Sequence, residues 1–189
     1  FDPGNAFQSL SIGQTQQLSF TYSVTDGKAT VQKQATLTVA GQNDLPVAVS
    51  AAVTTDEASL VSGRLSATDV DTNDTLIFSL ITPPESGALT IGTDGSFTFD
   101  PAGAFEGVAA GATQDVTFVY GVNDGTSTAQ KTATITVSGL NDPPGAVTVA
   151  ITAAEDTTLN GQLEATDADG DSLTFALISG PASGTLTVN

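Results

Sequence analysis

The sequence predicts an all-β protein made of tandem Greek-key β-sandwiches of about seven strands each. Three observations support this prediction: an internal repeat, apolar residues that alternate with polar ones, and turn-forming pairs between the alternating stretches. Alternation with a period of two is typical of strands that bury one face, and no helix is indicated. We therefore expect short strands along the whole chain.

The internal repeat is about 98 residues long. Residues 1–46 align without a gap on residues 99–144, a spacing of 99 − 1 = 98, and more than half of the aligned residues are identical. The similarity continues to Asp71, which falls on Asp169, and one residue is then lost. We therefore expect that the chain starts and ends inside repeats. The expected units are the C-terminal half of one repeat at 1–45, a complete repeat at 46–143, and the N-terminal half of the next at 144–189.

Seven strands are expected within the complete repeat. They lie near residues 47–51, 60–67, 76–80, 88–91, 97–99, 116–120 and 129–137. Turn signals separate several of them, namely Pro83-Pro84, Asp94-Gly95 and Asp124-Gly125. This number of strands in a unit of this length indicates a Greek-key β-sandwich. A unit of this size buries only about 60 to 65% of its surface on folding, so we expect a further source of stability.

Composition and charge narrow the possible functions. The chain has 21 acidic and 4 basic residues, a formal net charge of −17, and neither His nor Cys. Binding to nucleic acid or to anionic lipid requires clustered Lys and Arg, so neither is expected. Common zinc sites, His-activated nucleophiles and disulfides are excluded as well. No apolar run approaches the roughly 20 residues of a membrane span, so direct membrane insertion is not expected either.

The acidic residues cluster near the repeat boundaries. Asn43-Asp44 and Asn141-Asp142 mark the two boundaries, and Glu57 and its counterpart Glu155 follow at a fixed distance. Further along each repeat come carboxylates at alternate positions. These are Asp69 and Asp71 in one repeat, with Asn73 and Asp74 nearby, and Asp167, Asp169 and Asp171 in the next. Asp26 and Asp124 each precede a Gly at the end of an aromatic strand.

This pattern favours a hard divalent cation, and Ca²⁺ in particular. Ca²⁺ takes six to eight oxygen ligands at roughly 2.3 to 2.6 Å, and alternate Asp residues in a tight loop can direct several carboxylates to one point. Mg²⁺ prefers a compact octahedron that keeps several waters, so a carboxylate-rich site favours the larger ion. The pattern is not an EF-hand, because counting from Asp167 places Ser172 and Ile178 where Gly and Glu are required.

Four short motifs point to one family, and three of them occur twice. They are Asn-Asp-x-Pro at residues 43–46 and 141–144, Ala-Thr-Asp-x-Asp at 67–71 and 165–169, Asp-Gly-Ser-Phe-Thr-Phe at 94–99, and Tyr-x-Val-x-Asp-Gly at 22–27 and 120–125. With these motifs the whole chain resembles the cadherin-like and VCBS repeats of large bacterial surface adhesins, which are often exported by type I secretion (RTX-type adhesins). The resemblance implies Ig-like or cadherin-like sandwiches and a surface location outside the cell.

The resemblance also implies which residues hold Ca²⁺ between neighbouring repeats. The first boundary would use Asn43, Asp44, Asp69, Asp71 and Asp124. The second would use Glu57, Asn141, Asp142, Asp167 and Asp169. Glu106 stands where such domains place another acidic ligand, although its counterpart in the first block is Gln8. Asp171 and Asp74 lie beyond the one-residue length difference. For each of them, a role as a side ligand of the ion and a role as a plain loop acid both remain open.

The function expected from these ligands is structural. Ca²⁺ shared between neighbouring repeats would convert a flexible chain of small sandwiches into a stiff spacer of an extracellular adhesin, acting in cell adhesion or biofilm formation. Two alternatives remain open. One is a filament subunit whose half-repeats complete one another between identical chains, and the other is a module that binds sugar or a surface. An enzyme is not expected, because nothing in the sequence marks a catalytic cleft.

Overall fold

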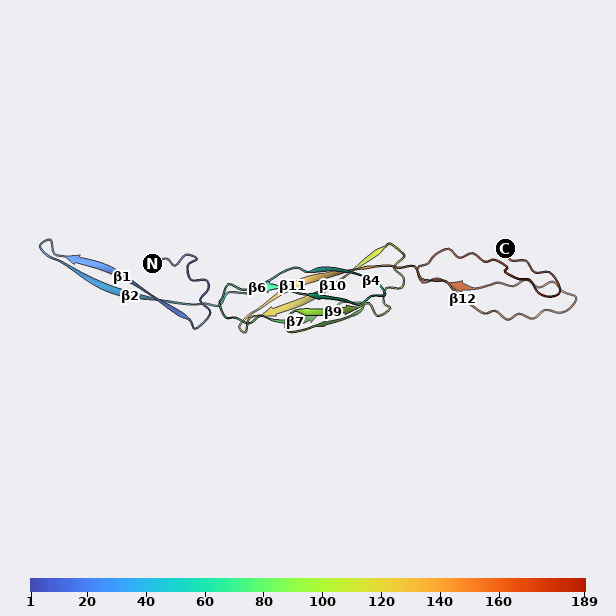
Figure 1. The fold of residues 1–189 in the computed structure, drawn as a ribbon, viewed down its shortest axis with the longest axis horizontal. Helices are drawn as coiled ribbons and strands as arrows, with labels where there is room; N and C mark the ends of the chain where they lie inside the picture. Colours follow the sequence, from blue (N-terminus) through green and yellow to red (C-terminus); the bar gives the residue numbers. More distant parts are fainter.

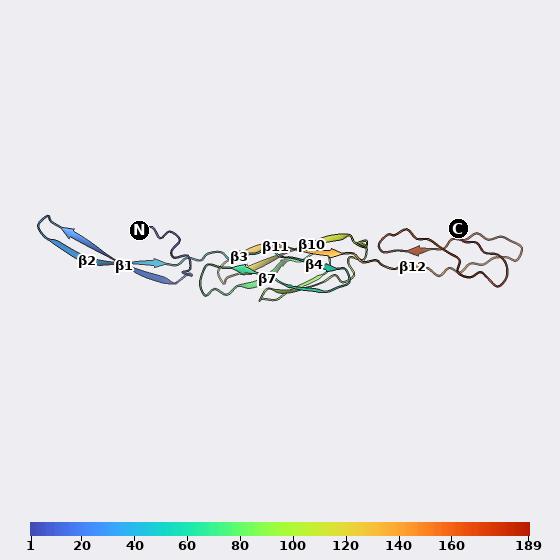
Figure 2. The same cartoon turned by 45° about the horizontal axis from the view of Figure 1, so that its top comes forward.

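The computed structural model describes residues 1–189 and is an all-β chain without helices, as predicted. Three units follow one another along one long axis, with the N-terminal unit at one end and the C-terminal unit at the other (Figures 1 and 2). Only the middle unit is a packed sandwich. Since there are no helices, no long apolar helix is available to span a membrane.

The middle unit contains nine strands in two main sheets and one short strand pair. One sheet has four strands in the order β4-β11-β10-β7, the other has three in the order β5-β9-β8, and β3 pairs with β6. The bounds are β3 Val47–Ala48, β4 Ala52–Asp56, β5 Val61–Arg64, β6 Ala67–Thr68, β7 Ile77–Thr82, β8 Ala88–Ile91, β9 Ser96–Asp100, β10 Thr113–Asn123 and β11 Thr128–Ser138.

The long β10–β11 hairpin organises this sandwich. Its strands pair antiparallel over their whole length, from Thr113 opposite Ser138 to Asn123 opposite Thr128. Gly125 in the predicted turn has a φ of 102°, a conformation that glycine adopts without a steric penalty. Alternate residues of both strands point inward, so the period-two pattern of the sequence becomes the inner face of the four-stranded sheet.

Most core residues lie in the strands that the alternation predicted, whereas Phe105 and Val122 lie outside them. All twelve buried apolar side chains lie in the middle unit: Leu65, Phe78, Phe97, Phe99, Phe105, Val116, Phe118, Tyr120, Val122, Ala133, Ile135 and Val137. The aromatic rings contact one another across the sheets, with the centroids of Phe97 and Phe118 5.9 Å apart. The Tyr120 hydroxyl donates a hydrogen bond to the backbone oxygen of Val49, which satisfies the one polar atom of this buried ring.

The first predicted strand differs from the observed structure. We expected one strand near residues 47–51, whereas β3 ends at Ala48 and β4 begins at Ala52. The chain changes sheets between them: Val49 N donates to Ser66 O on the β6 side, and Thr134 N then donates to Ala51 O as the parallel pairing of β4 with β11 begins. Alternation of apolar residues cannot reveal this change, because the side chains point inward in both sheets.

Residues 1–45 form a long hairpin and a preceding loop without a covering sheet. β1 (Thr15–Thr25) and β2 (Thr30–Ala40) pair antiparallel, from Thr15 opposite Ala40 to Thr25 opposite Thr30. No other strand pairs with them. Most of their side chains are therefore exposed, including the large apolar ones.

Residues 144–189 are extended but contain little regular pairing. β12 (Gly145–Ala146) pairs with β13 (Ala165–Thr166) in the same register in which β3 pairs with β6, 98 residues earlier. The rest runs out and back as loops (Figure 1), and its large apolar side chains are mostly exposed. The expected repeat boundaries at 46 and 143 stay a prediction.

Candidate metal centres at the repeat junctions

Two short segments connect the three units, and the predicted ligands lie around them. The first junction is Asn43-Asp44, between β2 and β3, and the second junction is Asn141-Asp142, between β11 and β12. Each segment is extended and lacks regular pairing. Its polar groups can therefore bond to loops of the following unit.

At the first junction the two adjoining units are joined by side-chain hydrogen bonds. Asn43 Nδ2 donates to Asp124 Oδ2 at 3.0 Å, and Asp44 N donates to Asp71 Oδ2 at 2.8 Å. Asp71 N in turn donates to Asp69 Oδ1 at 2.9 Å. The structure thus brings together all five residues that the sequence predicts at this junction.

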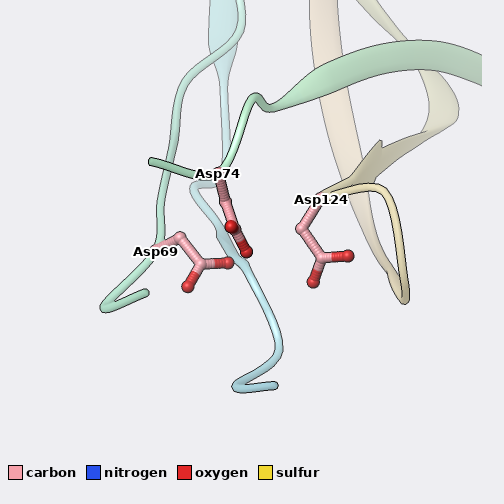
Figure 3. Close-up of side chains that lie close together, drawn as sticks. All are labelled: Asp69, Asp74 and Asp124. Carbon is pink, nitrogen blue, oxygen red and sulfur yellow. The ribbon is translucent and has the colours of Figure 1, made fainter. Parts of the chain in front are cut away.

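Three carboxylates converge beside this segment. Asp69 and Asp74 come from the loop between β6 and β7, and Asp124 comes from the β10–β11 turn (Figure 3). One oxygen atom of each lies within 4.8 Å of the others. Such proximity concentrates negative charge at one point, which costs free energy unless a cation or a proton compensates for it.

The electrostatics of Asp74 and Asp124 reflect this crowding in different ways. Partial burial, followed by the charges of Asp71, Asp69 and Asp124, raises the pKa of Asp74 above its ordinary value. Burial alone would also raise the pKa of Asp124. Hydrogen bonds from Ser127 N, Asn43 and Thr126 N outweigh that effect and lower it. Asp124 is therefore held as a carboxylate, while Asp74 has the most to gain from a nearby cation.

The sequence left Asp74 open between a side ligand and a plain loop acid, and its position explains why. The one-residue length difference lies just before it, so the alignment gave no clear counterpart. In the structure Asn73 has a φ of 76° and Gly170 a φ of 75°, and each immediately precedes a carboxylate of its cluster, Asp74 or Asp171. Asp74 therefore corresponds to Asp171, and the extra residue is absorbed within the loop. The available signal in the sequence was an Asn or a Gly immediately before an Asp, because these two residue types adopt a left-handed backbone most readily.

The second junction repeats this arrangement with fewer groups. Asp142 N donates to Asp169 Oδ2 at 2.8 Å, as Asp44 N does to Asp71 at the first junction. Asp167, Asp169 and Asp171 converge within 4.8 Å of one another. Asn141 Nδ2 bonds only to the backbone oxygen of Asp142, 2.9 Å away.

Glu57 lies beside the second junction, inside the middle unit. Its Oε1 accepts a hydrogen bond from Leu140 N at 2.7 Å, immediately before Asn141. The side chain is only 4% exposed, and its other oxygen, Oε2, has no hydrogen-bond partner. A buried carboxylate oxygen without a donor is costly, so a positive group is expected to face it.

Unpartnered buried oxygens recur at both junctions. They are Asp69 Oδ2 and Asp71 Oδ1 at the first, and Glu57 Oε2, Asp142 Oδ2 and Asp169 Oδ1 at the second. All the buried side-chain polar atoms that lack a partner are thus carboxylate oxygens of predicted ligands. As metal ligands these carboxylate oxygens are hard, and neither His nor Cys is present to suit a softer metal. The residues therefore fit Ca²⁺.

Glu106 is the one predicted ligand outside these arrangements. Its side chain is exposed, in the loop between β9 and β10, and it belongs to neither cluster of converging carboxylates. Its neighbour Gly107 lies close to Ala168 O, since a Cβ placed at Gly107 would be 3.6 Å from that atom. Glu106 is thus near the second junction without contacting its carboxylates, and its role as a ligand stays a prediction.

Sequence profiles of two bacterial families match the chain. The profile of the bacterial cadherin-like domain matches residues 43–139, which is more than half of the chain, and that of the bacterial Ig domain matches residues 141–189. No curated protein matches. Cadherin-like and Ig-like domains are typically structural modules without enzymatic activity, and in bacteria they are usually extracellular or on the cell surface. Cadherin-like domains generally bind calcium and contact their neighbours in tandem.

Solved structures similar to this chain are extracellular cadherin domains. The protocadherin GammaB4 extracellular domain is 14% identical, with 82% of this chain and 29% of that chain covered and a TM-score of 0.47. Cadherin domains 3–6 of protocadherin Gamma B2 give 16% identity, coverages of 82% and 43%, and a TM-score of 0.46. The human protocadherin-24 EC1-2 structure is 17% identical, with 67% of this chain and 67% of that chain covered and a TM-score of 0.43.

This chain spans less than a third of the protocadherin GammaB4 structure. The match of the bacterial cadherin-like profile covers all the strands of the middle unit, from β3 to β11. The chain belongs to the bacterial cadherin-like domain family.

Proposed function

We propose that these units are calcium-rigidified extender repeats of an extracellular bacterial adhesin. In this role the chain is a stiff spacer that holds a distal binding region away from the cell during adhesion or biofilm formation. Large surface adhesins of the RTX type, with VCBS-like repeats, are the class of parent protein that fits. The neighbouring repeats of the same chain are its immediate partners.

The observation that carries this proposal is the set of unpartnered, buried carboxylate oxygens at both junctions. At the first junction they sit next to a segment that links two units, with Asp44 bound to Asp71 and Asn43 bound to Asp124. A cation held there would contact both units at once. Binding energy would then oppose bending of the linker, because bending separates the ligands.

The chain's own residues prepare such a site. Asp124 Oδ1 accepts hydrogen bonds from Thr126 N and Ser127 N, both at 2.6 Å, which fixes the carboxylate in the turn. Its other oxygen, Oδ2, faces Asn43. Bound Ca²⁺ would supply positive charge to the cluster, and the fixed turn means that little side-chain freedom is lost on binding.

The energies are adequate for a switch in stiffness. Extracellular Ca²⁺ modules have dissociation constants of roughly 10⁻⁴ to 10⁻³ M. A site with tenfold excess of ion over that constant stabilises the bound state by about 1.4 kcal/mol. One such site at each junction would therefore contribute about 2.8 kcal/mol in total, a sizeable fraction of the roughly 5 to 15 kcal/mol by which a small domain is stable.

Calorimetric titration of the chain with Ca²⁺ tests the proposal. We expect saturable binding, and Asp124→Asn should weaken the first-junction site at least about tenfold, since it removes a charge but keeps an acceptor for the turn. Glu85→Gln is the matched control, because it removes one charge in the loop between β7 and β8 and leaves both clusters intact. Absence of saturable binding, or equal loss in both variants, would refute the proposal.

A further inference from the structure

The middle unit pairs its entering and leaving strands side by side. β4 is the edge strand of the four-stranded sheet, and β11 is its only strand partner. The two strands are parallel, from Ala52 opposite Thr134 to Asp56 opposite Ser138. The chain enters the unit through β3 and β4 and leaves it after β11. A pull transmitted along the chain therefore reaches the unit through this pair.

The orientation of the pair decides how such a pull acts on it. The strands of the middle unit run along the long axis of the molecule (Figure 1), and both β4 and β11 run toward the second junction. Tension on the first junction draws β4 backward, while tension on the second junction draws β11 forward. All the hydrogen bonds between the two strands then bear the load together. A single backbone hydrogen bond is weak in water, so bonds loaded together resist far more than bonds opened one after another.

The backbone ladder extends beyond the bounds of β4 at both ends. Thr134 N donates to Ala51 O at 3.0 Å, one residue before β4 begins. Glu57 N donates to Ser138 O at 3.0 Å, one residue after β4 ends. The segment that must slide is therefore longer than the strand itself, which increases the number of bonds under load.

Side chains reinforce the end of the pair next to the second junction. Ser138 Oγ donates to Thr55 O at 3.1 Å, and Leu140 N donates to Glu57 Oε1 at 2.7 Å. Leu140 is the last residue before the Asn141-Asp142 segment, so tension that leaves the unit there acts first on these bonds. Glu57 thus connects the strand pair to the second junction through its own backbone and side chain.

β11 is held more firmly than β4. On its other side it pairs with β10 along all eleven residues, and its inward side chains Ile135 and Val137 are fully buried. β4 has no strand on its outer edge, and Val53 is only partly buried against the core. Under tension β4 is therefore the strand that has to slide.

β3 offers much less resistance than β4. It pairs with β6 over two residues only, and the Val49 N bond to Ser66 O adds one further contact. The Tyr120 hydroxyl holds the chain at Val49 O, just before it crosses to the other sheet. Tension entering from the first junction should therefore detach β3 first and then meet the longer ladder of β4 and β11.

We propose that the parallel β4–β11 pair is a mechanical clamp, which keeps the middle unit folded when the chain is pulled through its two junctions. The clamp consists of hydrogen bonds and apolar contacts, so it needs no metal ion. That the chain carries tension in use rests on the spacer function proposed above, whereas the resistance is a property of the fold.

Single-molecule pulling in two directions provides the first test. The chain has no Cys, so a Cys pair introduced for attachment is unambiguous. Leu45→Cys with Pro144→Cys pulls along the natural direction, and Ser59→Cys with Pro144→Cys places both attachment points at the second-junction end of the clamp. All three side chains are exposed. Each residue that unfolds adds at most about 3.3 to 3.6 Å of length, so the gain in length identifies unfolding of the middle unit.

The two directions should give different unfolding forces. Through Leu45 the clamp is loaded along its length, and we expect the higher force at the same pulling speed. Through Ser59 the same bonds open one after another from one end, and we expect a lower force. An equal or higher force through Ser59 would overturn the proposal, because the resistance would then not depend on how β4 and β11 are loaded.

Two proline variants test which backbone bonds carry the load. Because Ala51 O and Glu57 N face β11 and backbone groups alternate in direction along a strand, Thr55 N faces β11 and Thr54 N faces away. At a given force Thr55→Pro should unfold roughly ten times faster or more, since a carbonyl of β11 loses its donor. Thr54→Pro is the matched control and should change the rate much less, because an edge strand tolerates Pro where its amide faces outward.

A further control concerns the hydroxyl that Thr55→Pro also removes. Thr55 Oγ1 donates to Ser59 O at 2.7 Å, and Thr55→Val removes this bond but keeps the backbone amide. We expect Thr55→Val to resist force nearly as the native chain does. Equal acceleration by Thr54→Pro and Thr55→Pro would overturn the assignment. If Thr55→Pro does not fold, the comparison of pulling directions decides the question, since it changes only exposed side chains.

All pulling measurements are made in chelator, which separates this proposal from the proposed function. A force that depends on direction in chelator, together with calorimetry that detects no Ca²⁺ binding, would refute the calcium function alone. Saturable Ca²⁺ binding by a chain whose unfolding force is the same in both directions would refute the clamp alone.

Discussion

Residues 1–45 and 99–143 have closely related sequences, yet only residues 99–143 bury the inward-facing side chains of their hairpin. Both form a hairpin with eleven paired residues on each strand, in the same register and with the same Asp-Gly turn. The side chains of β10 and β11 that point inward are buried, whereas those of β1 and β2 are mostly exposed. Backbone pairing is thus encoded locally, but burial depends on the N-terminal half of a repeat lying opposite.

The two junctions differ in the same way. The first is flanked by a complete unit, whose turn provides Asp124, and the second is followed by residues 144–189, which include no such turn. Both have three converging carboxylates and an Asp backbone amide bonded to the central Asp of the loop. The alternate Asp residues therefore form their cluster without the rest of the repeat, while the bond to the boundary Asn needs the distant hairpin.

Truncation of the equivalent Phe in each hairpin should change the unfolding free energy by very different amounts. Phe118→Ala should destabilise the sandwich by roughly 3 to 5 kcal/mol, because it leaves a cavity in the core. Phe20→Ala, at the equivalent position, should change the unfolding free energy of the dilute monomer by no more than about 0.5 kcal/mol. Denaturant unfolding followed by circular dichroism measures both, and similar losses would contradict the exposure of Phe20.

A glycine at the end of each hairpin provides the next comparison. A Cβ at Gly139 would lie 1.7 Å from Val108 O, and one at Gly41 would lie 2.1 Å from Leu10 O. Gly139→Ala should therefore cost about 2 to 3 kcal/mol of sandwich stability, since backbone must move. Gly41→Ala meets the same clash outside the sandwich and should leave the unfolding of the middle unit unchanged. Equal thermal midpoints for the two variants would count against this account.

Removal of calcium tests how much each junction contributes to the unfolding free energy. Chelation should lower the unfolding free energy by about 1.4 kcal/mol for each site that had been filled at tenfold excess. Asp69→Asn should remove the effect of the first site and Asp167→Asn that of the second. Thermal unfolding at several Ca²⁺ concentrations measures this, and a midpoint that does not depend on Ca²⁺ in the native chain would contradict it.

The smallest effect concerns a contact found only at the first junction. Ser11 Oγ donates to Thr72 O at 2.6 Å, and Thr72 N donates to Ser9 O at 3.2 Å. The counterpart of Ser11 is Ala109, which has no hydroxyl. Ser11→Ala should weaken docking of the two units by about 1 kcal/mol. Hydrogen exchange at the Thr72 amide should quicken several-fold, with the amides of β10 unchanged as the internal control.

Most of the fold followed from the sequence because the strands bury one face. The strand at residues 88–91 has the predicted bounds, and the Asp94-Gly95 and Asp124-Gly125 turns lie between strands as expected. The change of sheet between β3 and β4 did not follow, since it is decided by which backbone groups find partners. Nor could alternation show that Phe20 would be exposed, because burial needs a segment far away in the sequence.

Part of the candidate site could also be predicted from the sequence. The boundary Asn-Asp and the alternate Asp residues were identified from their recurrence, and the structure brings them together. The role of Asp74 was left open, because a loop of different length separates it from the aligned Asp pair. Its position depends on the left-handed backbone of Asn73, a conformation that a spacing argument does not include. Whether these residues bind Ca²⁺ stays a prediction.

Cations shared across the junctions are proposed to keep adjoining units in line. Small-angle X-ray scattering of the dilute chain in Ca²⁺, in chelator, and after Ca²⁺ is restored tests this most directly. We expect a long, narrow distance distribution with Ca²⁺, a shorter and broader one in chelator, and full recovery on restoration. Superimposable scattering curves in all three conditions would contradict it.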